Sequence, residues 1–225
     1  MNTVKSGVSN ILAELLLKTT PPRTPRHLLT RPRLGLEDEQ FRDRSLILVQ
    51  APAGFGKTSL LAQWRREHLA SGAAVAWISA DSSEDPMRFL LSLILAVRTC
   101  GRPNFGRGLS DGAISSLGEL EGITAWLAEI AQMSLELVLV VDEAERLAPA
   151  RFEGLSYLAH NAPANLSLVV AARGGLDHIF ADLAAYGHCA SVGSAQLRFR
   201  LDETLGLVHG RFGKRVDADA CARLH

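Results

Sequence analysis

The stretch of sequence that decides the fold runs from residue 51 to residue 58 and reads Ala51-Pro52-Ala53-Gly54-Phe55-Gly56-Lys57-Thr58. An apolar run typical of a buried strand, Ser45 to Gln50, comes before it, and a helical pattern starts at Lys57. A glycine-rich turn between a strand and a helix is the setting of a phosphate-binding P-loop. The general pattern begins with glycine, and we interpret Ala51 as a tolerated variant. The simpler alternative is a glycine turn followed by a solvent-exposed lysine.

The residue types of this loop fit a nucleotide bound together with Mg²⁺. Glycines let successive backbone N–H groups point at phosphate oxygens, and the N-terminus of the following helix adds a partial positive charge. We expect Lys57 to neutralise the β- and γ-phosphates during catalysis and Thr58 to give its hydroxyl to the metal. The residues expected to bind the phosphates are Ala53, Gly54, Phe55, Gly56, Lys57, Thr58 and Ser59.

Beyond the loop, short apolar runs alternate with helical patterns, which predicts an α/β fold with a mainly parallel sheet in three layers. Strands are expected over 45–50, 74–79, 135–141 and 167–172, and helices over 57–69, 86–100, 117–133 and 150–160. After Gly174 we expect a helical stretch over 176–186, short strands over 189–192 and 197–200, and a helix from Asp202.

Two carboxylates, Asp142 and Glu143, follow the apolar run that ends at Val141. Ligands of open α/β sheets bind at the carboxyl ends of the strands, so both side chains are expected near the P-loop. Asp142 is suited to hold Mg²⁺ directly or through water, and Glu143 could orient or deprotonate the water that attacks the γ-phosphate. Acidic residues after a strand also serve as simple helix caps, and that alternative stays open.

Arg173 is likewise a polar residue at the end of an apolar run, the next one along the chain, and Gly174 and Gly175 after it turn the chain. If its strand lies beside the P-loop strand, Arg173 could reach the γ-phosphate and distinguish a nucleoside triphosphate from a diphosphate. The competing interpretation is a surface ion pair, because strand order cannot be deduced from the sequence.

Composition excludes several classes of function. Of 225 residues 47% are hydrophobic, and 24 basic residues balance 24 acidic ones, so no overall field attracts nucleic acid or a membrane. The longest apolar stretch, residues 89 to 97, is too short to span a bilayer. The cysteines are far apart and show no zinc-ligand spacing, so we expect a cytoplasmic protein without disulfides.

The sequence divides into four parts. Residues 1–18 are expected to form an N-terminal helix, 19–44 a proline-rich basic arm, 45–201 the P-loop ATPase domain and 202–225 the truncated start of a helical module. Up to Arg33 the arm carries Arg23, Arg26, Arg31 and Arg33 and no acidic residue. It could touch DNA phosphates, but a solvated linker or an edge of the nucleotide site is the favoured interpretation because no aromatic residues are interleaved for base stacking.

Taken together, these motifs resemble the nucleotide-binding domain of the MalT-like, LuxR-type bacterial transcription regulators, which are ATPases of the STAND class. The motifs that carry the resemblance are Arg31-Pro32-Arg33-Leu34, the P-loop leading into Ser59-Leu60-Leu61-Ala62-Gln63-Trp64, Ala76-Trp77-Ile78-Ser79-Ala80-Asp81, Asp85-Pro86-Met87-Arg88-Phe89-Leu90, Val140-Val141-Asp142-Glu143, Val170-Ala171-Ala172-Arg173 and Leu197-Arg198-Phe199. Ala51 is usual in this family.

The resemblance implies ATP or ADP with Mg²⁺ at the P-loop, Arg31 near the adenine, and slow hydrolysis that resets a switch. Members often carry Asp-Asp where this chain has Asp142-Glu143, and Ser-Arg where it has Ala172-Arg173. The resemblance also implies that an inducer and DNA bind only through modules beyond this chain, with ATP-dependent self-association and no membrane contact.

Two other functions remain open from the sequence. A P-loop phosphotransferase acting on a small molecule needs an arginine-rich lid, for which the loop over residues 101–112, with Arg102 and Arg107, is the candidate. A degenerate scaffold that binds no nucleotide is the second alternative, and the intact Lys57, Thr58 and Asp142 count against it.

Overall fold

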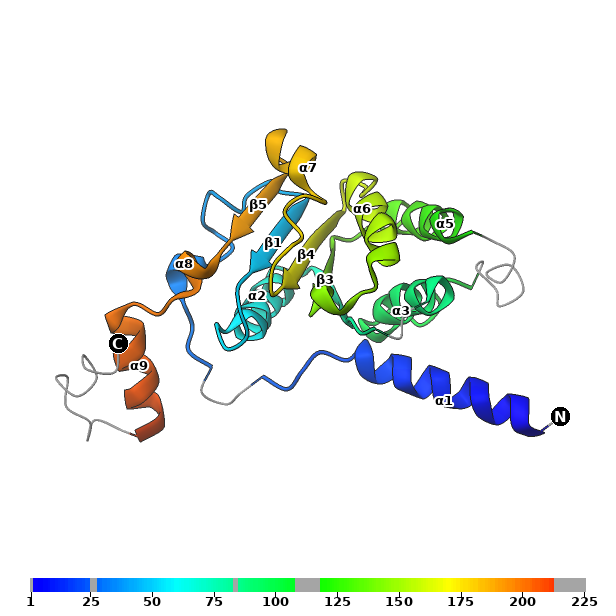
Figure 1. Ribbon diagram of the computed structural model, residues 1–225, viewed down its shortest axis with the longest axis horizontal. Coiled ribbons are helices and arrows are strands. Elements are labelled where there is room, and N and C mark those ends of the chain that lie inside the picture. The colour runs from blue at the N-terminus through cyan, green and yellow to red at the C-terminus, as the bar shows by residue number, and fades with distance from the viewer. Residues whose placement is uncertain (1, 25–27, 83–84, 108–117, 213–225) are drawn as a thin grey trace.

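In the computed structural model, which describes residues 2–24, 28–82, 85–107 and 118–212, five parallel strands form one sheet (Figure 1). The strands follow the order β2-β3-β4-β1-β5 across the sheet. Their bounds are β1 (Leu46–Gln50), β2 (Ala74–Ser79), β3 (Leu137–Asp142), β4 (Leu166–Ala172) and β5 (Cys189–Val192). The P-loop strand β1 therefore pairs with β4, the strand that leads to Arg173.

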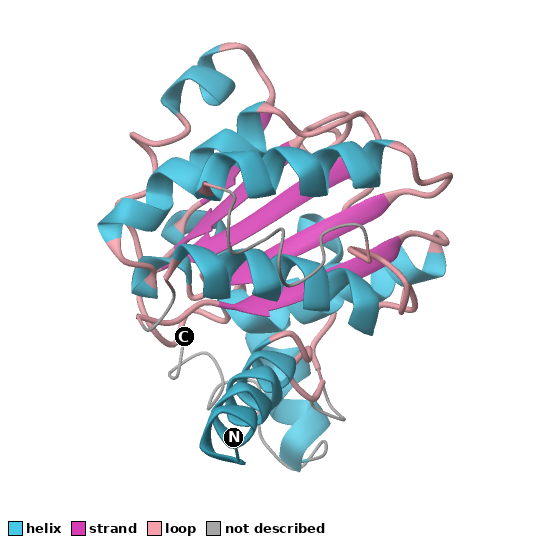
Figure 2. Ribbon diagram, turned by 90° about the vertical axis from the view of Figure 1, so that its right-hand side faces the viewer, coloured by secondary structure: helices cyan, strands magenta, loops and turns pink. Residues whose placement is uncertain are grey.

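Helices cover both faces of the sheet, which confirms the predicted three-layer α/β fold (Figure 2). Their bounds are α1 (Asn2–Lys18), α2 (Lys57–Ala70), α3 (Pro86–Thr99), α5 (Glu119–Ala131), α6 (Phe152–His160), α7 (Ala181–Ala185), α8 (Ser194–Leu197) and α9 (Leu201–Phe212). Single 3-10 turns occur at η1 (Pro32–Leu34), η2 (Ala144–Arg146) and η3 (Pro149–Arg151). No helix among the described residues is long and apolar enough to cross a membrane.

The two faces of the sheet build two separate cores, because successive side chains of a strand point to opposite faces. Leu46 and Leu48 pack on one side with α3, α5 and α6, where Trp126 is fully buried. Ile47 and Val49 pack on the other side with α2, α8 and the arm. Because all the strands are parallel, their carboxyl ends share one edge of the sheet, and the P-loop lies at this edge.

The helix α1 extends beyond the sheet in Figure 1 and is fastened near its C-terminal end. Leu15 is fully buried, the Glu14 carboxylate lies 2.7 Å from a guanidinium nitrogen of Arg88 on α3, and Lys18 Nζ lies 2.7 Å from a carboxylate oxygen of Asp81. In the arm that follows, the described residues 19–24 and 28–31 form neither helix nor strand before η1, as the prolines predict. Arg26 in this arm lies outside the described residues.

One expected strand is wrong. The residues 197–200 form no strand, and α8 occupies 194–197 instead, because Gln196 Oε1 accepts a 2.8 Å hydrogen bond from the Gly193 N–H at the start of that helix. The carbonyls that a strand would pair with a neighbour are bonded to arginine side chains of the arm, as described below.

The helix expected over 176–186 is much shorter than predicted. Gln50 at the end of β1 accepts a hydrogen bond from the Leu176 N–H at 2.9 Å and donates one to Asp177, which holds a turn where the helix was expected. Only α7 remains helical there. The helix predicted from Asp202 is present as α9, and residues 213–225 lie outside the described part of the chain.

Candidate functional site

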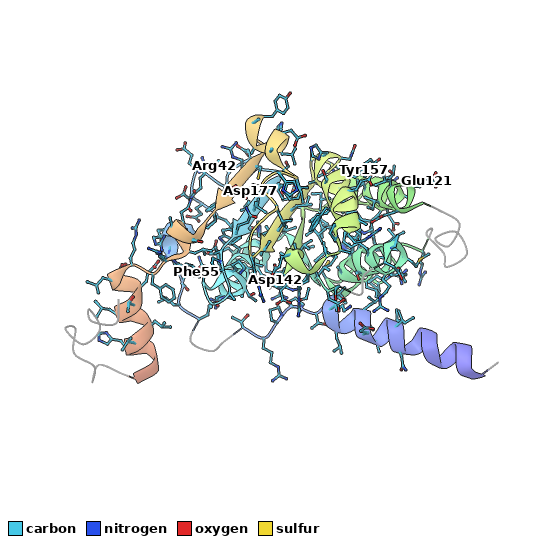
Figure 3. All side chains as sticks on the ribbon, in the orientation of Figure 1. Arg42, Phe55, Glu121, Asp142, Tyr157 and Asp177 are labelled. Atoms are coloured by element: carbon cyan, nitrogen blue, oxygen red, sulfur yellow. The ribbon has the colours of Figure 1, made fainter. Side chains whose placement is uncertain are left out.

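The P-loop forms a turn at the carboxyl edge of the sheet that only glycine adopts without strain. Gly54 and Gly56 have φ angles of 84° and 80°, and Gly56 is the N-cap residue that directly precedes α2. The left-handed region is costly for residues with a Cβ atom, so glycine is required at both positions. Phe55 between them is partly buried against the core beneath α2, and Figure 3 labels both Phe55 and Asp142.

The Lys57 side chain folds back over its own loop. Its Nζ donates hydrogen bonds to the carbonyl oxygens of Ala51 at 2.7 Å and Pro52 at 3.2 Å. The ammonium group is therefore already held against the loop by two of the loop's own carbonyl oxygens.

Thr58 and Asp142, the two residues predicted to bind the metal, are hydrogen-bonded to each other across the site. Thr58 Oγ1 donates a 2.8 Å hydrogen bond to Asp142 Oδ2, while Asp142 Oδ1 accepts from the Glu143 N–H at 2.9 Å. Asp142 is only 4% exposed, and this burial raises its pKa although both hydrogen bonds oppose the shift. A hydroxyl and a carboxylate side by side are oxygen donors of the kind that Mg²⁺ takes together with nucleotide phosphates.

Glu143 follows Asp142 in a left-handed backbone conformation, with a φ of 57°. Such a conformation is uncommon for a residue other than glycine and is often stored strain at a functional site. Its carboxylate is half exposed and forms an ion pair with Arg146 at 2.8 Å. The structure therefore places Glu143 at the same carboxyl edge of the sheet as the P-loop. Its side chain is bound to Arg146 within the same turn.

Arg173 stands at the end of β4, beside the P-loop strand. Ala51 N–H donates to the Ala172 carbonyl at 3.2 Å, which joins the start of the P-loop to the residue before Arg173. The guanidinium binds Glu145, with 2.9 Å between Arg173 Nε and Glu145 Oε1, and Glu145 Oε2 accepts from the Arg173 N–H at 3.1 Å.

Sequence reasoning missed Glu145 and Gln50 at this edge. Glu145 carries no pattern that reveals a partner 28 residues away. Gln50 could have been found, because it is a polar residue at the carboxyl end of a buried strand, which is the same signal that indicated Asp142 and Arg173.

Arg31 lies away from the P-loop lysine and is 5% exposed. Its Nε is 3.1 Å from Glu203 Oε1 in the first turn of α9, and its Nη2 donates to the carbonyl of Leu197 at 2.9 Å. Its backbone N–H and carbonyl both bond to the amide of Gln63 on α2. The sequence did not indicate Gln63 or Glu203 as partners of Arg31.

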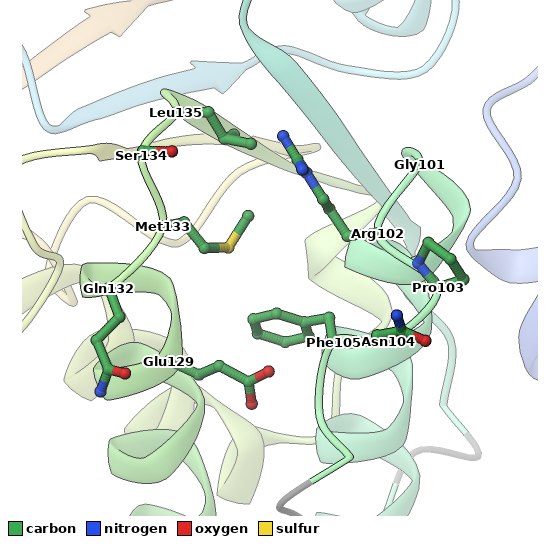
Figure 4. Close-up of a pocket in the computed structure, with 10 residues that line it drawn as sticks. All are labelled: Gly101, Arg102, Pro103, Asn104, Phe105, Glu129, Gln132, Met133, Ser134 and Leu135. Atoms are coloured by element: carbon green, nitrogen blue, oxygen red, sulfur yellow. The ribbon is translucent and has the colours of Figure 1, made fainter.

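The segment considered as a phosphotransferase lid lies at the opposite edge of the sheet. Arg102 lines a cavity of about 440 Å³ together with Phe105 from its own segment and Ser134 and Leu135 from the segment before β3 (Figure 4). Because the strands are parallel, the start of β3 is the end farthest from the P-loop. The described part of this loop does not cover the candidate site, and residues 108–112 lie outside the described chain.

A protein-family model and several curated proteins match this chain. Residues 39–180 match a protein-family model described as an AAA domain. The serine/threonine-protein kinase PknK of Mycobacterium tuberculosis (strain ATCC 25618 / H37Rv) is 33% identical over 195 residues, which cover 84% of this chain and 17% of PknK. The HTH-type transcriptional regulator MalT of Vibrio cholerae is 29% identical over 206 residues, covering 89% of this chain and 22% of MalT. The chain thus spans less than a quarter of these relatives.

Solved structures share the fold at low sequence identity. Cdc6p from Pyrobaculum aerophilum superposes with a TM-score of 0.54 at 15% identity. The superposed region covers 92% of this chain and 56% of the Cdc6p chain. The Orc1 protein of Aeropyrum pernix, solved in complex with DNA, has a TM-score of 0.51 at 16% identity, with coverage of 74% and 43%.

Proposed function

The chain belongs to the AAA domain family, and from that premise we propose that it is the ATP-dependent switch domain of a bacterial transcriptional regulator. It is an AAA-type P-loop ATPase domain related to the MalT regulators. The observation that carries the proposal is the pairing of Thr58 with Asp142 at 2.8 Å beside a P-loop whose lysine is already held in place.

In this proposal each residue of the site has one task. Thr58 and Asp142 hold Mg²⁺, which when bound neutralises charge on the phosphates. Lys57 exchanges its loop carbonyls for the β- and γ-phosphate oxygens, and the backbone N–H groups from Ala53 to Ser59 bind the remaining oxygens. Binding at this site is thus mainly electrostatic, and it depends on the charge of Lys57.

Glu143 and Arg173 have tasks that require them to leave their present partners. Glu143 prepares the attacking water once its carboxylate is released from Arg146. Arg173 reaches the γ-phosphate once it is released from Glu145. Because both groups start bound elsewhere, we expect hydrolysis to be slow, as a switch requires.

The proposal places other contacts outside this domain. The relatives named MalT are HTH-type transcriptional regulators more than four times as long as the matched region, so we assign DNA and inducer binding to other regions of such a protein. Within this domain we propose ATP-dependent self-association and a cytoplasmic location. The guanidinium of Arg31 is bound to Glu203. We therefore assign the contact with the adenine of the nucleotide to the backbone around Arg31.

The test is calorimetric titration of the chain with ATP and ADP, with and without Mg²⁺, alongside Lys57→Ala. The charge-assisted hydrogen bonds of Lys57 are each worth about 1.5 to 3 kcal/mol, so we expect at least a tenfold loss of ATP affinity in the variant. Arg66→Ala is the matched control, because Arg66 is an exposed cation on the same helix. A folded wild-type chain that binds neither nucleotide, or a Lys57→Ala variant that binds as well as wild type, overturns the proposal.

A further inference from the structure

Two arginines of the arm and one glutamate of α9 form a cluster that we call the arginine joint, made of Arg31, Arg33 and Glu203. Glu203 Oε1 lies 3.1 Å from Arg31 Nε and 2.8 Å from Arg33 Nε, and Oε2 accepts from the Arg200 N–H at 2.9 Å. The Glu203 side chain is only 6% exposed. The carboxylate is therefore fully engaged by groups from two segments about 170 residues apart in sequence.

The same arginines cap the end of α8. Arg31 Nη2 donates to the Leu197 carbonyl at 2.9 Å, Arg33 Nη1 donates to the Gln196 carbonyl at 2.7 Å, and Arg33 Nη2 donates to the Arg198 carbonyl at 2.8 Å. Carbonyls at a helix C-terminus lack intrahelical partners and attract cations. The Arg31 guanidinium also lies 5.0 Å from the ring centre of Phe199. The arm thus binds the whole connection between α8 and α9.

On its other side the arm is fixed to α2 by three neighbouring side chains. Gln63 Oε1 accepts from the Arg31 N–H at 2.8 Å, and Trp64 Nε1 donates to the Leu34 carbonyl at 2.6 Å. Glu67 Oε2 accepts from the Leu36 N–H at 2.9 Å. These bonds run along one stretch of the helix that begins at the P-loop.

The helix α9 rests on the arm. Besides the arginine joint, its Gly206 lies so close to Leu29 that a Cβ atom there would be 3.2 Å from a Leu29 methyl carbon. Figure 1 shows α9 apart from the sheet, at one end of the molecule. A shift of the arm relative to the sheet is therefore carried directly to α9.

We propose that the arginine joint transmits the state of the nucleotide site to α9, with α2 and the arm as the connecting pieces. This inference rests on the proposed function, because it needs a nucleotide at the P-loop. Lys57 must leave the carbonyls of Ala51 and Pro52 to bind phosphate, and this changes the start of α2. Gln63 is six residues along that helix, about 9 Å away, and α2 moves as a rigid rod over such a length.

The experiment measures hydrogen exchange of the α9 amides in the 225-residue chain with no nucleotide, with Mg²⁺ and ADP, and with Mg²⁺ and ATP. Nucleotide affinity is measured by calorimetry on the same samples. The variant is Glu203→Gln, which removes the charge but keeps the side-chain size. Asp202→Asn is the matched control, because Asp202 is the exposed neighbour in the same helical turn.

In wild type and in Asp202→Asn we expect nucleotide to change α9 exchange by about threefold or more. In Glu203→Gln we expect exchange about tenfold faster without nucleotide, because charged hydrogen bonds are lost, and no remaining response to nucleotide. ATP affinity should change less than about threefold, since Glu203 lies outside the phosphate site. Should Glu203→Gln unfold, Arg33→Lys replaces it, because lysine keeps the charge but cannot span two carbonyls and a carboxylate.

The outcomes separate the two proposals. If wild type binds no nucleotide, the proposed function fails and transmission from the nucleotide site fails with it. If wild type binds ATP but α9 exchange does not respond, transmission alone is overturned. A full nucleotide response in Glu203→Gln, or in Arg33→Lys where that variant replaces it, also overturns the role of the joint and leaves the proposed function standing.

Discussion

At the scale of single residues, the candidate nucleotide site is built from side chains that already have partners. Lys57 binds its own loop, Thr58 binds Asp142, Glu143 binds Arg146 and Arg173 binds Glu145. The proposed function requires each of these bonds to be exchanged for a bond to Mg²⁺, nucleotide or water. The relative strength of these bonds therefore sets how readily each group is released.

The bond between Arg173 and Glu145 leads to a prediction for ATP recognition. In Glu145→Gln the charge attraction is gone, so Arg173 no longer has to leave a carboxylate to reach the γ-phosphate. An exposed ion pair is worth about 0.2 to 1 kcal/mol, so we expect the affinity for ATP relative to ADP to rise by up to about fivefold. Calorimetry with both nucleotides measures the ratio.

Glu153→Gln is the control for this change, because Glu153 is an exposed glutamate on α6. It should leave the ratio of ATP to ADP affinity at the wild-type value. An unaltered ratio in Glu145→Gln would mean that Arg173 does not contact the γ-phosphate.

At the scale of elements, the strands and main helices could be predicted because their signals are local. Buried apolar runs identify β1 to β4, and the Asp85 cap followed by Pro86 marks the start of α3, where Asp85 Oδ1 accepts from the Arg88 N–H at 2.8 Å. The position of β4 beside β1 could not be predicted, because strand order depends on packing over the whole sheet.

The arginine joint and the short α8 show where local signals end. Leu197 and Phe199 alternate as in a strand, but the carbonyls around them bind Arg31 and Arg33, which lie more than 160 residues earlier. No local sequence pattern predicts a partner at that distance along the chain. The residues of the candidate phosphate-binding loop could be proposed from the sequence because they occupy neighbouring positions in one loop.

An ion pair between α6 and α7 predicts a pH dependence. His160 on α6 bonds to the Ser156 carbonyl and to the carboxylate of Asp182 on α7. Burial alone would lower the pKa of His160, but these two bonds outweigh it and hold the pKa above its ordinary value of 6.5. The bond from His160 holds the pKa of Asp182 below its ordinary value of 3.8.

The sign of the effect follows from these directions. The raised pKa of His160 means that its contribution to stability is complete below pH 6.5 and is lost as the pH rises through the raised value. The contribution of Asp182 is present above pH 3.8 and is lost as the pH falls through its lowered pKa. We expect His160→Gln to flatten the fall in the free energy of unfolding above pH 6.5, as measured by urea titration.

His178 provides the comparison for this experiment, because it is an exposed histidine in the turn before α7. His178→Gln should keep the wild-type pH profile of the unfolding free energy. If His160→Gln keeps that profile as well, the ion pair does not contribute to stability.

At the scale of the whole molecule, the arginine joint connects the segment before the sheet to the segment after it. Burial alone would raise the pKa of Glu203, but the hydrogen bonds from Arg33, Arg31 and the Arg200 N–H outweigh it and lower the pKa to about 2. The Glu203 carboxylate therefore stays charged well below the ordinary glutamate pKa of 4.5.

This lowered pKa predicts how the joint behaves in acid. The stability that Glu203 contributes is complete above its ordinary pKa of 4.5 and is lost as the pH falls toward about 2. At pH 7 we expect Glu203→Gln to lose about 2 kcal/mol in the free energy of unfolding, because hydrogen bonds to a charged group are removed. In urea titrations the difference from wild type should shrink between pH 4.5 and pH 3, whereas a constant difference would contradict the assignment of the charge to Glu203.

The order of strands in the sheet has a consequence for synthesis on the ribosome. β1 carries the P-loop, yet its two neighbours, β4 and β5, are made about 120 and 140 residues after it. At a translation rate of roughly 5 to 20 residues per second, β1 waits on the order of ten seconds with both edges unpaired. The growing chain must therefore be kept from pairing with other chains during this interval, and the P-loop strand is enclosed in the sheet only after β4 and β5 have both been made.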